Sequence, residues 1–123
     1  MSPRELVLEW VARFNGADID GLAALYAPGA VNHQIVTEPL VGREAIRQMF
    51  AVEFGRARMT CHVESLFECG EWAILEWIDP NGLRGCGFFL VQQDQIVRQR
   101  GYFDQLSFFR LQGLPVPADY LGA

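Results

Sequence analysis

The feature that most constrains the fold is a change of hydrophobic period near residue 59. Before it, apolar residues recur at three- and four-residue steps, which is typical of amphipathic helices. After it, apolar residues recur at every second position, which predicts strands over 59–69, 71–79, 84–93 and 95–105. Because the links between these strands are short, they should pair as an antiparallel meander. Helices followed by strands favour an α+β fold over alternating βαβ units.

Three helices are predicted in the first half of the chain. The first begins at Ser2, which forms an S-x-x-E capping box with Glu5, and ends at Asn15-Gly16. The second begins at the N-cap residue Asp18 and is stopped by Pro28-Gly29. A short strand is expected over 30–36 and a loop over 37–42, followed by the third helix over 43–54.

Both faces of the predicted sheet carry apolar residues. In the second predicted strand, alternation puts Trp72 on one face and Trp77 on the other. A chain of 123 residues has too few helices to cover both tryptophans. We therefore expect the helices to cover one face and a second copy of the chain to cover the other, in a homodimer.

Length and composition predict one domain over residues 1–123, with 113–123 as an extended C-terminal tail because Pro115 and Pro117 exclude helix and central strand. The formal net charge of −5 makes nucleic acid an unexpected partner. No apolar run is long enough for a membrane span, and no secretory signal is recognisable, so a cytoplasmic location is expected.

The three cysteines show no metal-binding or redox spacing, and they are interpreted as small buried residues in a reducing compartment. Cys61-His62 suggests half of a metal site. A zinc site needs three or four converging ligands, however, and His33 is the one other histidine. Neither a metal nor an organic cofactor is expected.

Several segments carry a resemblance to a known family. They are Ala17-Asp18-Ile19-Asp20-Gly21-Leu22-Ala23-Ala24-Leu25-Tyr26-Ala27-Pro28, Val31-Asn32-His33, Leu40-Val41-Gly42-Arg43-Glu44-Ala45-Ile46 and Arg100-Gly101-Tyr102-Phe103-Asp104. In these segments and in its element order the chain resembles the SnoaL-like proteins of the nuclear-transport-factor-2-like superfamily. The resemblance implies a cone-shaped, cystatin-like roll. In that fold three N-terminal helices pack on a strongly curved, mostly antiparallel sheet that encloses a cavity, commonly in a homodimer.

The superfamily includes isomerases, cyclases, hydrolases and non-catalytic binding domains, so the resemblance alone names no activity. Ketosteroid isomerase places its catalytic residues where this chain has Trp10, Gln34 and Cys86, and none of the three matches. Steroid isomerisation by that mechanism is therefore not expected. Of the Asp/Arg/Asp set of limonene epoxide hydrolase, Asp79 matches one aspartate, whereas Trp77 and Gly101 replace the other two residues.

Two residues are candidates for acid–base catalysis. His33 titrates near neutrality and is expected at the cavity floor, although a hydrogen-bonded core histidine is the structural alternative. Asp79 opens an Asp-Pro-Asn-Gly turn, where an aspartate is also expected for local hydrogen bonds alone. Asp104 lies near the strand position of the polyketide cyclase aspartate, but a structural contact with Arg98 or Arg100 is the alternative.

The resemblance and the strand alternation together predict an apolar pocket for a small hydrophobic ligand. Besides His33, the residues expected to line it are Trp10, Phe14, Tyr26, Gln34, Phe50, Trp77, Cys86, Phe88, Gln99 and Phe103. Two functions remain open. One is an isomerase, cyclase or hydrolase that uses His33 and Asp79 on a hydrophobic metabolite. The other is a non-catalytic ligand-binding or dimerisation module that has lost the catalytic set.

Overall fold

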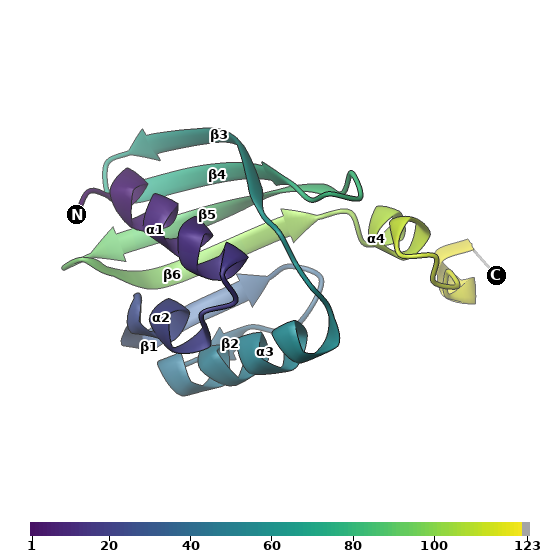
Figure 1. Ribbon diagram of the computed structural model, residues 1–123, viewed down its shortest axis with the longest axis horizontal. Helices are drawn as coiled ribbons and strands as arrows, with labels where there is room; N and C mark the ends of the chain where they lie inside the picture. The colour runs from purple at the N-terminus through teal and green to yellow at the C-terminus, as the bar shows by residue number, and fades with distance from the viewer. Residues whose placement is uncertain (122–123) are drawn as a thin grey trace.

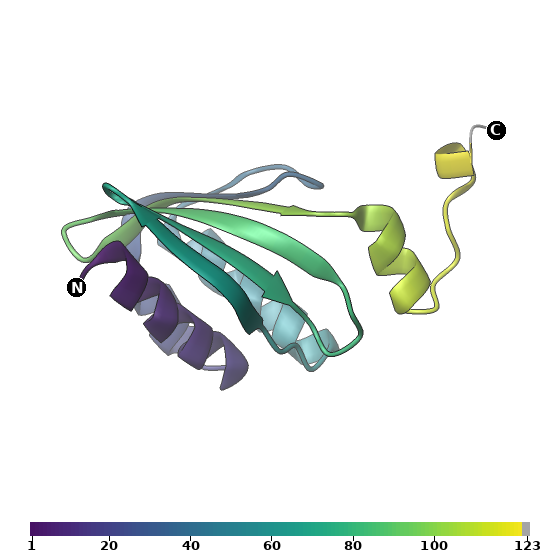
Figure 2. The ribbon, with the colours of Figure 1, turned by 90° about the horizontal axis from the view of Figure 1, so that it is seen from above.

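The computed structural model describes residues 1–121, which form a six-stranded sheet with helices on one side (Figures 1 and 2). The three helices against the sheet are α1 (Pro3–Asn15), α2 (Ile19–Ala24) and α3 (Arg43–Arg56). The strands are β1 (Tyr26–Gln34), β2 (Leu40–Val41), β3 (His62–Cys69), β4 (Trp72–Ile78), β5 (Arg84–Gln92) and β6 (Gln95–Phe103). We call the face under these helices the helix side and the opposite face the open side.

The strand order is β2-β1-β6-β5-β4-β3, and every neighbouring pair is antiparallel except β1 and β6. The predicted α+β class and the antiparallel meander of the second half are confirmed. The strongly curved, cone-like sheet is not: seen from above, the sheet is twisted but does not curl around an enclosed space (Figure 2). The helices pack flat against it, so side chains fill the layer between them.

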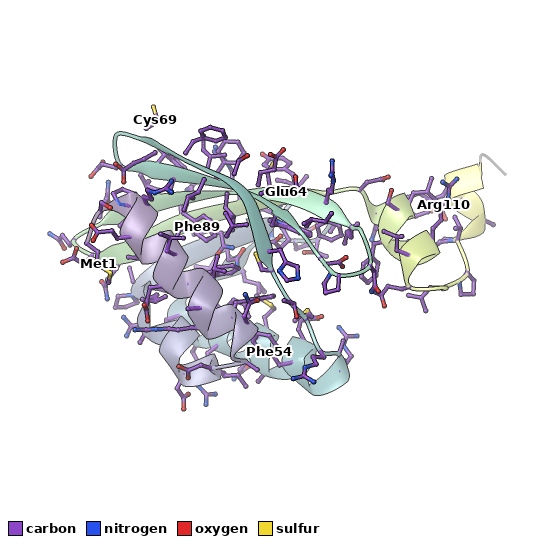
Figure 3. All side chains as sticks on the ribbon, turned by 45° about the horizontal axis from the view of Figure 1, so that its top comes forward. Met1, Phe54, Glu64, Cys69, Phe89 and Arg110 are labelled. Carbon is purple, nitrogen blue, oxygen red and sulfur yellow. The ribbon has the colours of Figure 1, made fainter. Side chains whose placement is uncertain are left out.

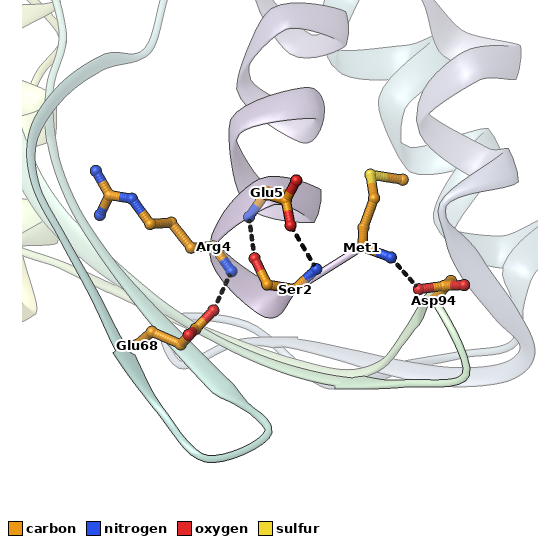
Figure 4. A network of polar contacts seen from close by, with 6 residues as sticks. All are labelled: Met1, Ser2, Arg4, Glu5, Glu68 and Asp94. Carbon is orange, nitrogen blue, oxygen red and sulfur yellow. Dashed lines mark hydrogen bonds and ion pairs between the residues drawn. The ribbon is translucent and has the colours of Figure 1, made fainter.

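The start of α1 follows the capping rules. The Ser2 hydroxyl accepts a hydrogen bond from the backbone N–H of Glu5 at 3.1 Å, and the Glu5 carboxylate accepts one from the N–H of Ser2 at 3.0 Å. The N-terminus is also held from the sheet (Figure 4): the Met1 amino group contacts Asp94, and the N–H of Arg4 donates to Glu68. The predicted capping box is therefore confirmed.

The boundary between the second helix and the first strand differs from the prediction. Helix α2 ends at Ala24, and β1 begins at Tyr26 rather than at residue 30. Pro28-Gly29 was predicted to stop a helix but lies inside the strand, in the part where the pairing register with β6 shifts. Proline is compatible with such an irregular stretch because no regular ladder hydrogen bond is lost there.

The chain after β6 also differs from the prediction. It forms a fourth helix, α4 (Gln105–Leu111), whereas the sequence predicted a strand up to residue 105, no element over 106–112, and a tail from residue 113. Asp104 is the N-cap of this helix. Residues 114–117 have no regular structure, and η1 (Ala118–Leu121) is a short 3-10 helix. Residues 122 and 123 of the predicted tail lie outside the described residues. We call 104–121 the C-terminal arm; Figures 1 and 2 show it projecting from the body.

The core lies between the helices and the helix side of the sheet (Figure 3). Its largest fully buried side chains are Tyr26, Phe89, Leu6, Leu22, Ile46 and Leu75. None of the helices in residues 1–121 is long and apolar enough to cross a membrane.

Candidate functional site

A chain of buried hydrogen bonds crosses the helix side. The indole nitrogen of Trp10, on α1, donates to the Tyr26 hydroxyl at 3.0 Å, and that hydroxyl donates to the side-chain oxygen of Gln99 on β6. All three residues are buried. Burial raises the pKa of the Tyr26 hydroxyl well above its ordinary value, so the group stays protonated at neutral pH. It therefore serves as a fixed donor and acceptor inside the core.

Aromatic rings fill the space beside this chain. The Trp10 ring lies 5.1 Å from Phe14 and 5.3 Å from Phe89, between ring centroids, and Phe50 packs edge-on to both Trp10 and Phe14. Such offset and edge-to-face contacts are favourable aromatic pairings. Trp10, Phe14, Tyr26 and Phe50, which were predicted to line a pocket, thus pack against one another and form a large part of the core.

A second polar group lies near the ends of β1 and β6. The Gln34 amide donates to the side-chain oxygen of Asn32 at 3.0 Å. Asn32 is 2% exposed, and its side-chain nitrogen has no hydrogen-bond partner. Gly101 pairs with Gln34 in the sheet, and a Cβ on Gly101 would lie 1.9 Å from the Gln34 side-chain oxygen. The missing side chain at 101 thus lets the Gln34 amide lie flat on β6 and reach Asn32.

We call a set of residues that pair across neighbouring strands a row. The row next to Gln34 and Gly101 on the helix side also contains a glycine. Trp77, Gly85 and Phe103 pair across β4, β5 and β6. A Cβ on Gly85 would lie 2.3 Å from the Trp77 ring, so the indole rests directly on the strand. Gln34, Trp77 and Phe103 are half-buried, unlike the core beside them. We call Asn32, Gln34, Trp77 and Phe103 the sheet-end site.

The structure does not bring the two predicted catalytic residues together. His33 lies on the open side, in register with Arg100, and its Nε2 is 3.1 Å from the carbonyl oxygen of Thr37. Asp79 lies in the β4–β5 turn, where its carboxylate accepts hydrogen bonds from the N–H groups of Asn81 and Leu83 at 2.8 and 2.9 Å. Three strand spacings, about 14 Å, separate β1 from β4. His33 and Asp79 therefore cannot share a proton directly.

Two predicted lining residues also lie on the open side. Cys86 pairs with Glu76 and Tyr102, and Phe88 pairs with Ile74 and Arg100, so both face away from the helices. Burial and the nearby Glu76 carboxylate raise the pKa of the Cys86 thiol. The predicted inward set is thus divided: Trp10, Phe14, Tyr26, Gln34, Phe50, Trp77, Gln99 and Phe103 lie on the helix side, whereas His33, Cys86 and Phe88 lie on the open side.

The open side carries one arginine in an unusual setting. The guanidinium carbon of Arg100 lies 4.9 Å from the ring centroid of Trp72 and 5.4 Å from that of Phe88. Its Nε is buried and has no hydrogen-bond partner. Nearby, a depression of about 310 Å³ is lined by Glu76, Arg84, Gly85, Cys86, Tyr102 and Phe103.

The sequence interpretation missed Asn32, Glu76 and Arg100. The available signal was strand alternation, which puts Asn32 with Gln34 and separates both from His33. Across residues 1–121, no three His, Cys, Asp or Glu side chains come together in a way that could hold a metal ion.

Comparison with solved structures shows the fold. A protein from Catenulispora acidiphila with a ketosteroid isomerase-like fold, in complex with trimethylamine, is 18% identical, with a TM-score of 0.83 over 95% of this chain and 100% of that one. A putative polyketide cyclase from Xanthomonas campestris is 19% identical, with a TM-score of 0.79 over 89% and 98%. An LEH-like epoxide hydrolase from M. tuberculosis is 18% identical, with a TM-score of 0.77 over 89% and 87%.

No curated protein matches the chain in sequence. The model of the SnoaL-like domain, however, matches residues 7–99, which span α1 to most of β6 and include Asn32, Gln34 and Trp77. These residues are three quarters of the chain, and the neighbours share the same arrangement of helices and sheet. The chain therefore belongs to the SnoaL-like domain family.

Proposed function

We propose that this protein binds a small, uncharged and largely apolar molecule at the sheet-end site. The observation that carries the proposal is the buried side-chain nitrogen of Asn32, which has no acceptor. A buried donor without a partner costs about 1–3 kcal/mol, and a ligand oxygen placed there would recover that cost. The half-buried Trp77 and Phe103 supply apolar surface on the same side of the sheet, toward the end where β1 and β6 finish.

The charge of the ligand follows from the polar groups around the site. Asn32 and Gln34 are neutral amides, and the next polar groups on the helix side, Gln99 and Tyr26, are neutral as well. An ionised ligand would lose its hydration without meeting an opposite charge, which is costly. An uncharged ring compound with one acceptor oxygen, such as a cyclic ketone, fits these groups.

A thermal-shift titration tests the proposal. The probes are a bicyclic ketone and the hydrocarbon with the same rings, and a ligand that binds the folded protein alone must raise Tm. We expect the ketone to raise Tm more than the hydrocarbon. If neither probe raises Tm at concentrations up to its solubility, the proposal is wrong.

A glycine pair provides matched variants for the same titration. Gly101→Ala places a methyl group against the Gln34 amide, which must move away from Asn32, and the ketone should then bind at least about tenfold more weakly, a loss of about 1.4 kcal/mol. Gly29→Ala is the control, because it adds the same methyl group on β1, the strand that carries Asn32 and Gln34, at a position where a Cβ meets nothing within 4 Å. Equal affinities for wild type, Gly101→Ala and Gly29→Ala would place the ligand elsewhere.

Catalysis is the second candidate function, because two structural neighbours are a putative polyketide cyclase and an epoxide hydrolase. A catalyst needs an acid or base within hydrogen-bond reach of the reacting atoms. His33 and Asp79 remain the candidate acid or base, each acting without the other. Incubation with epoxides and polyketide-like ketones, followed by mass spectrometry, tests for turnover. A compound consumed by wild type and left intact by His33→Ala would favour the enzyme.

We also propose that the open side pairs with a second copy of the chain in a homodimer. Large apolar side chains follow three neighbouring strands on this side: Phe67, Trp72, Ile74, Ile78, Phe88 and Leu90. Phe67 is 60% exposed. Glu76, Arg98 and Arg100 lie among them, so the surface carries both signs of charge and suits pairing with itself. Sedimentation equilibrium tests this, and a monomer at micromolar concentration would contradict it.

We propose a cytoplasmic location as well. It is supported by the cysteines, since Cys61, Cys69 and Cys86 are all free thiols, as is usual in a reducing compartment.

A further inference from the structure

We infer that Arg100 of one copy forms an ion pair with Glu76 of the second copy, twice, across a two-fold axis near Gly87. This inference rests on the homodimer proposed above and adds the register in which the two open sides meet. It assigns a partner in the second copy to two charged groups of that surface, Glu76 and Arg100.

Arg100 is held over two aromatic rings, and its Nε has no acceptor. Its guanidinium is held over the rings of Trp72 and Phe88, at 4.9 and 5.4 Å from their centroids. This stacking fixes the position of the group and leaves its planar fork free for a carboxylate. Its Nε is already buried within one copy and has no partner there. A second copy placed on this side would bury the rest of the group, so a carboxylate is needed to offset the lost hydration.

Glu76 supplies the matching acid. It is exposed, and it is the only acidic residue on the open side of β4, β5 and β6. Within one copy it cannot reach Arg100 in its observed position. The two residues lie two strands and one row apart, about 12 Å between Cα atoms. In addition, Arg100 extends over Phe88 toward Trp72, away from the row that contains Glu76.

Other charged groups on this side are placed differently. Arg84 on β5 is 3.2 Å from Glu64 on β3, across the intervening β4, and so has an acid within its own copy. Arg98 is exposed, and its row contains Trp72 and Leu90. His33 lies beside Arg100 in register and is held by the carbonyl of Thr37.

Glu76 and Arg100 are too far apart to pair within one copy, but a two-fold axis can bring Glu76 of one copy to Arg100 of the other. On β5, Cys86 pairs with Glu76 and Phe88 pairs with Arg100, so Gly87 lies midway between the backbone positions of Glu76 and Arg100. Two sheets that stack face to face are related by a two-fold axis lying between them. An axis that passes over Gly87, at right angles to the line from Glu76 to Arg100, places Glu76 of each copy opposite Arg100 of the other, within reach of its side chain. Both ion pairs then form at the centre of the interface.

Charge reversal in the full-length protein tests this arrangement. Glu76→Arg and Arg100→Glu each place like charges opposite one another, and we expect each homodimer to weaken at least about 30-fold in Kd, measured by sedimentation equilibrium. Mixing the two variants places opposite charges at both contacts of the mixed dimer. Native mass spectrometry should therefore show a mixed dimer that is at least about tenfold more abundant than either variant homodimer.

Arg98→Glu is the matched control, because it makes the same change of charge one row away on the same strand and side. It should leave the homodimer Kd within about threefold of wild type, and it should not pair preferentially with Glu76→Arg. Circular dichroism confirms that each variant is folded. If wild type dimerises but the mixture shows no preference for the mixed dimer, the ion pair is wrong and the homodimer stands. If wild type is a monomer, both proposals fail.

Discussion

Tyr26 joins two buried polar groups that otherwise have no partner of their own on the helix side. Its hydroxyl accepts from the Trp10 indole at 3.0 Å and donates to Gln99. Tyr26→Phe removes one oxygen and leaves a buried donor and a buried acceptor unpaired. We expect the free energy of unfolding to fall by about 2–4 kcal/mol. Urea denaturation followed by tryptophan fluorescence measures the loss.

The control for this variant is Tyr102→Phe. Tyr102 is 40% exposed on the open side, so removal of its hydroxyl should change the free energy of unfolding by less than about 0.5 kcal/mol. Similar losses in both variants would mean that the buried chain of hydrogen bonds contributes nothing particular to stability.

Alkaline pH gives a second, independent test of Tyr26. Burial raises the pKa of its hydroxyl in the folded state above its ordinary value of 10.0. The protonated form is therefore favoured by folding. Its contribution is fully present below about pH 10 and is lost as the pH rises from there toward the folded pKa. We expect wild type to lose stability more steeply above pH 10 than Tyr26→Phe, measured by urea denaturation at each pH. Parallel curves would contradict this.

The placement of His33 shows what alternation can and cannot predict about single residues. Alternation correctly groups Asn32 with Gln34 and separates His33 from both. Alternation does not say which of the two sets of residues faces the helices when both faces of the strand carry apolar residues. Cys86 and Phe88 were misplaced for a related reason, because β5 has apolar residues on both faces and glycines at 85 and 87. The sides are decided by contacts with helices distant in sequence.

Helix α4 depends on its N-cap. The Asp104 carboxylate accepts a hydrogen bond from the Ser107 hydroxyl at 2.5 Å and one from the N–H of Leu106 at 3.2 Å. The Ser107 bond, together with the two backbone N–H bonds and Arg110, holds the pKa of Asp104 below its ordinary value of 3.8, against the opposing effect of desolvation. A lowered pKa means that the cap stabilises the helix above that value and is lost as the pH falls through the folded pKa.

We therefore expect the amide signals of Leu106 and Ser107 to shift toward unfolded values below about pH 3.8, as the cap is protonated. An NMR titration from pH 6 to pH 2 measures the shift. Asp104→Asn keeps an acceptor at the cap but cannot titrate, so its signals should show no such step. The same step in Asp104→Asn would assign it to another carboxyl group.

Elements with local signals were predicted well, and those decided by distant contacts were not. The capping box of α1 and the turns between β3, β4, β5 and β6 are set by residues adjacent in sequence. By contrast, Pro28-Gly29 was read as a helix stop. Tyr26 is buried and pairs with Ile96, so contact with β6 carries the strand through these residues. The two-residue strand β2 exists because Leu40 and Val41 pair with β1.

At the scale of the whole molecule, the body and the C-terminal arm differ in how they are held. The body has a continuous core between the sheet and α1, α2 and α3. In the arm, no residue of α4 is buried, and its rings mostly meet within the arm: Phe108 contacts Phe109, and Phe109 contacts Tyr120. Phe103 and Phe108, 6.1 Å apart between ring centroids, link the arm to the end of β6. Figure 3 shows Arg110 on α4, outside the body.

Removal of the arm should therefore cost the body little. A chain that stops after Asp104 keeps all six strands and the three helices of the core, and it loses one aromatic contact at Phe103. Such a pair contributes about 0.5–1.5 kcal/mol beyond area burial. We expect the free energy of unfolding to fall by no more than about 1.5 kcal/mol, measured by urea denaturation at low micromolar concentration. Phe108→Ala in the full-length chain is the control and should lose a similar amount. A loss several times larger in the truncated chain alone, and one that grows with protein concentration, would mean that the arm packs on a second copy and belongs to the interface.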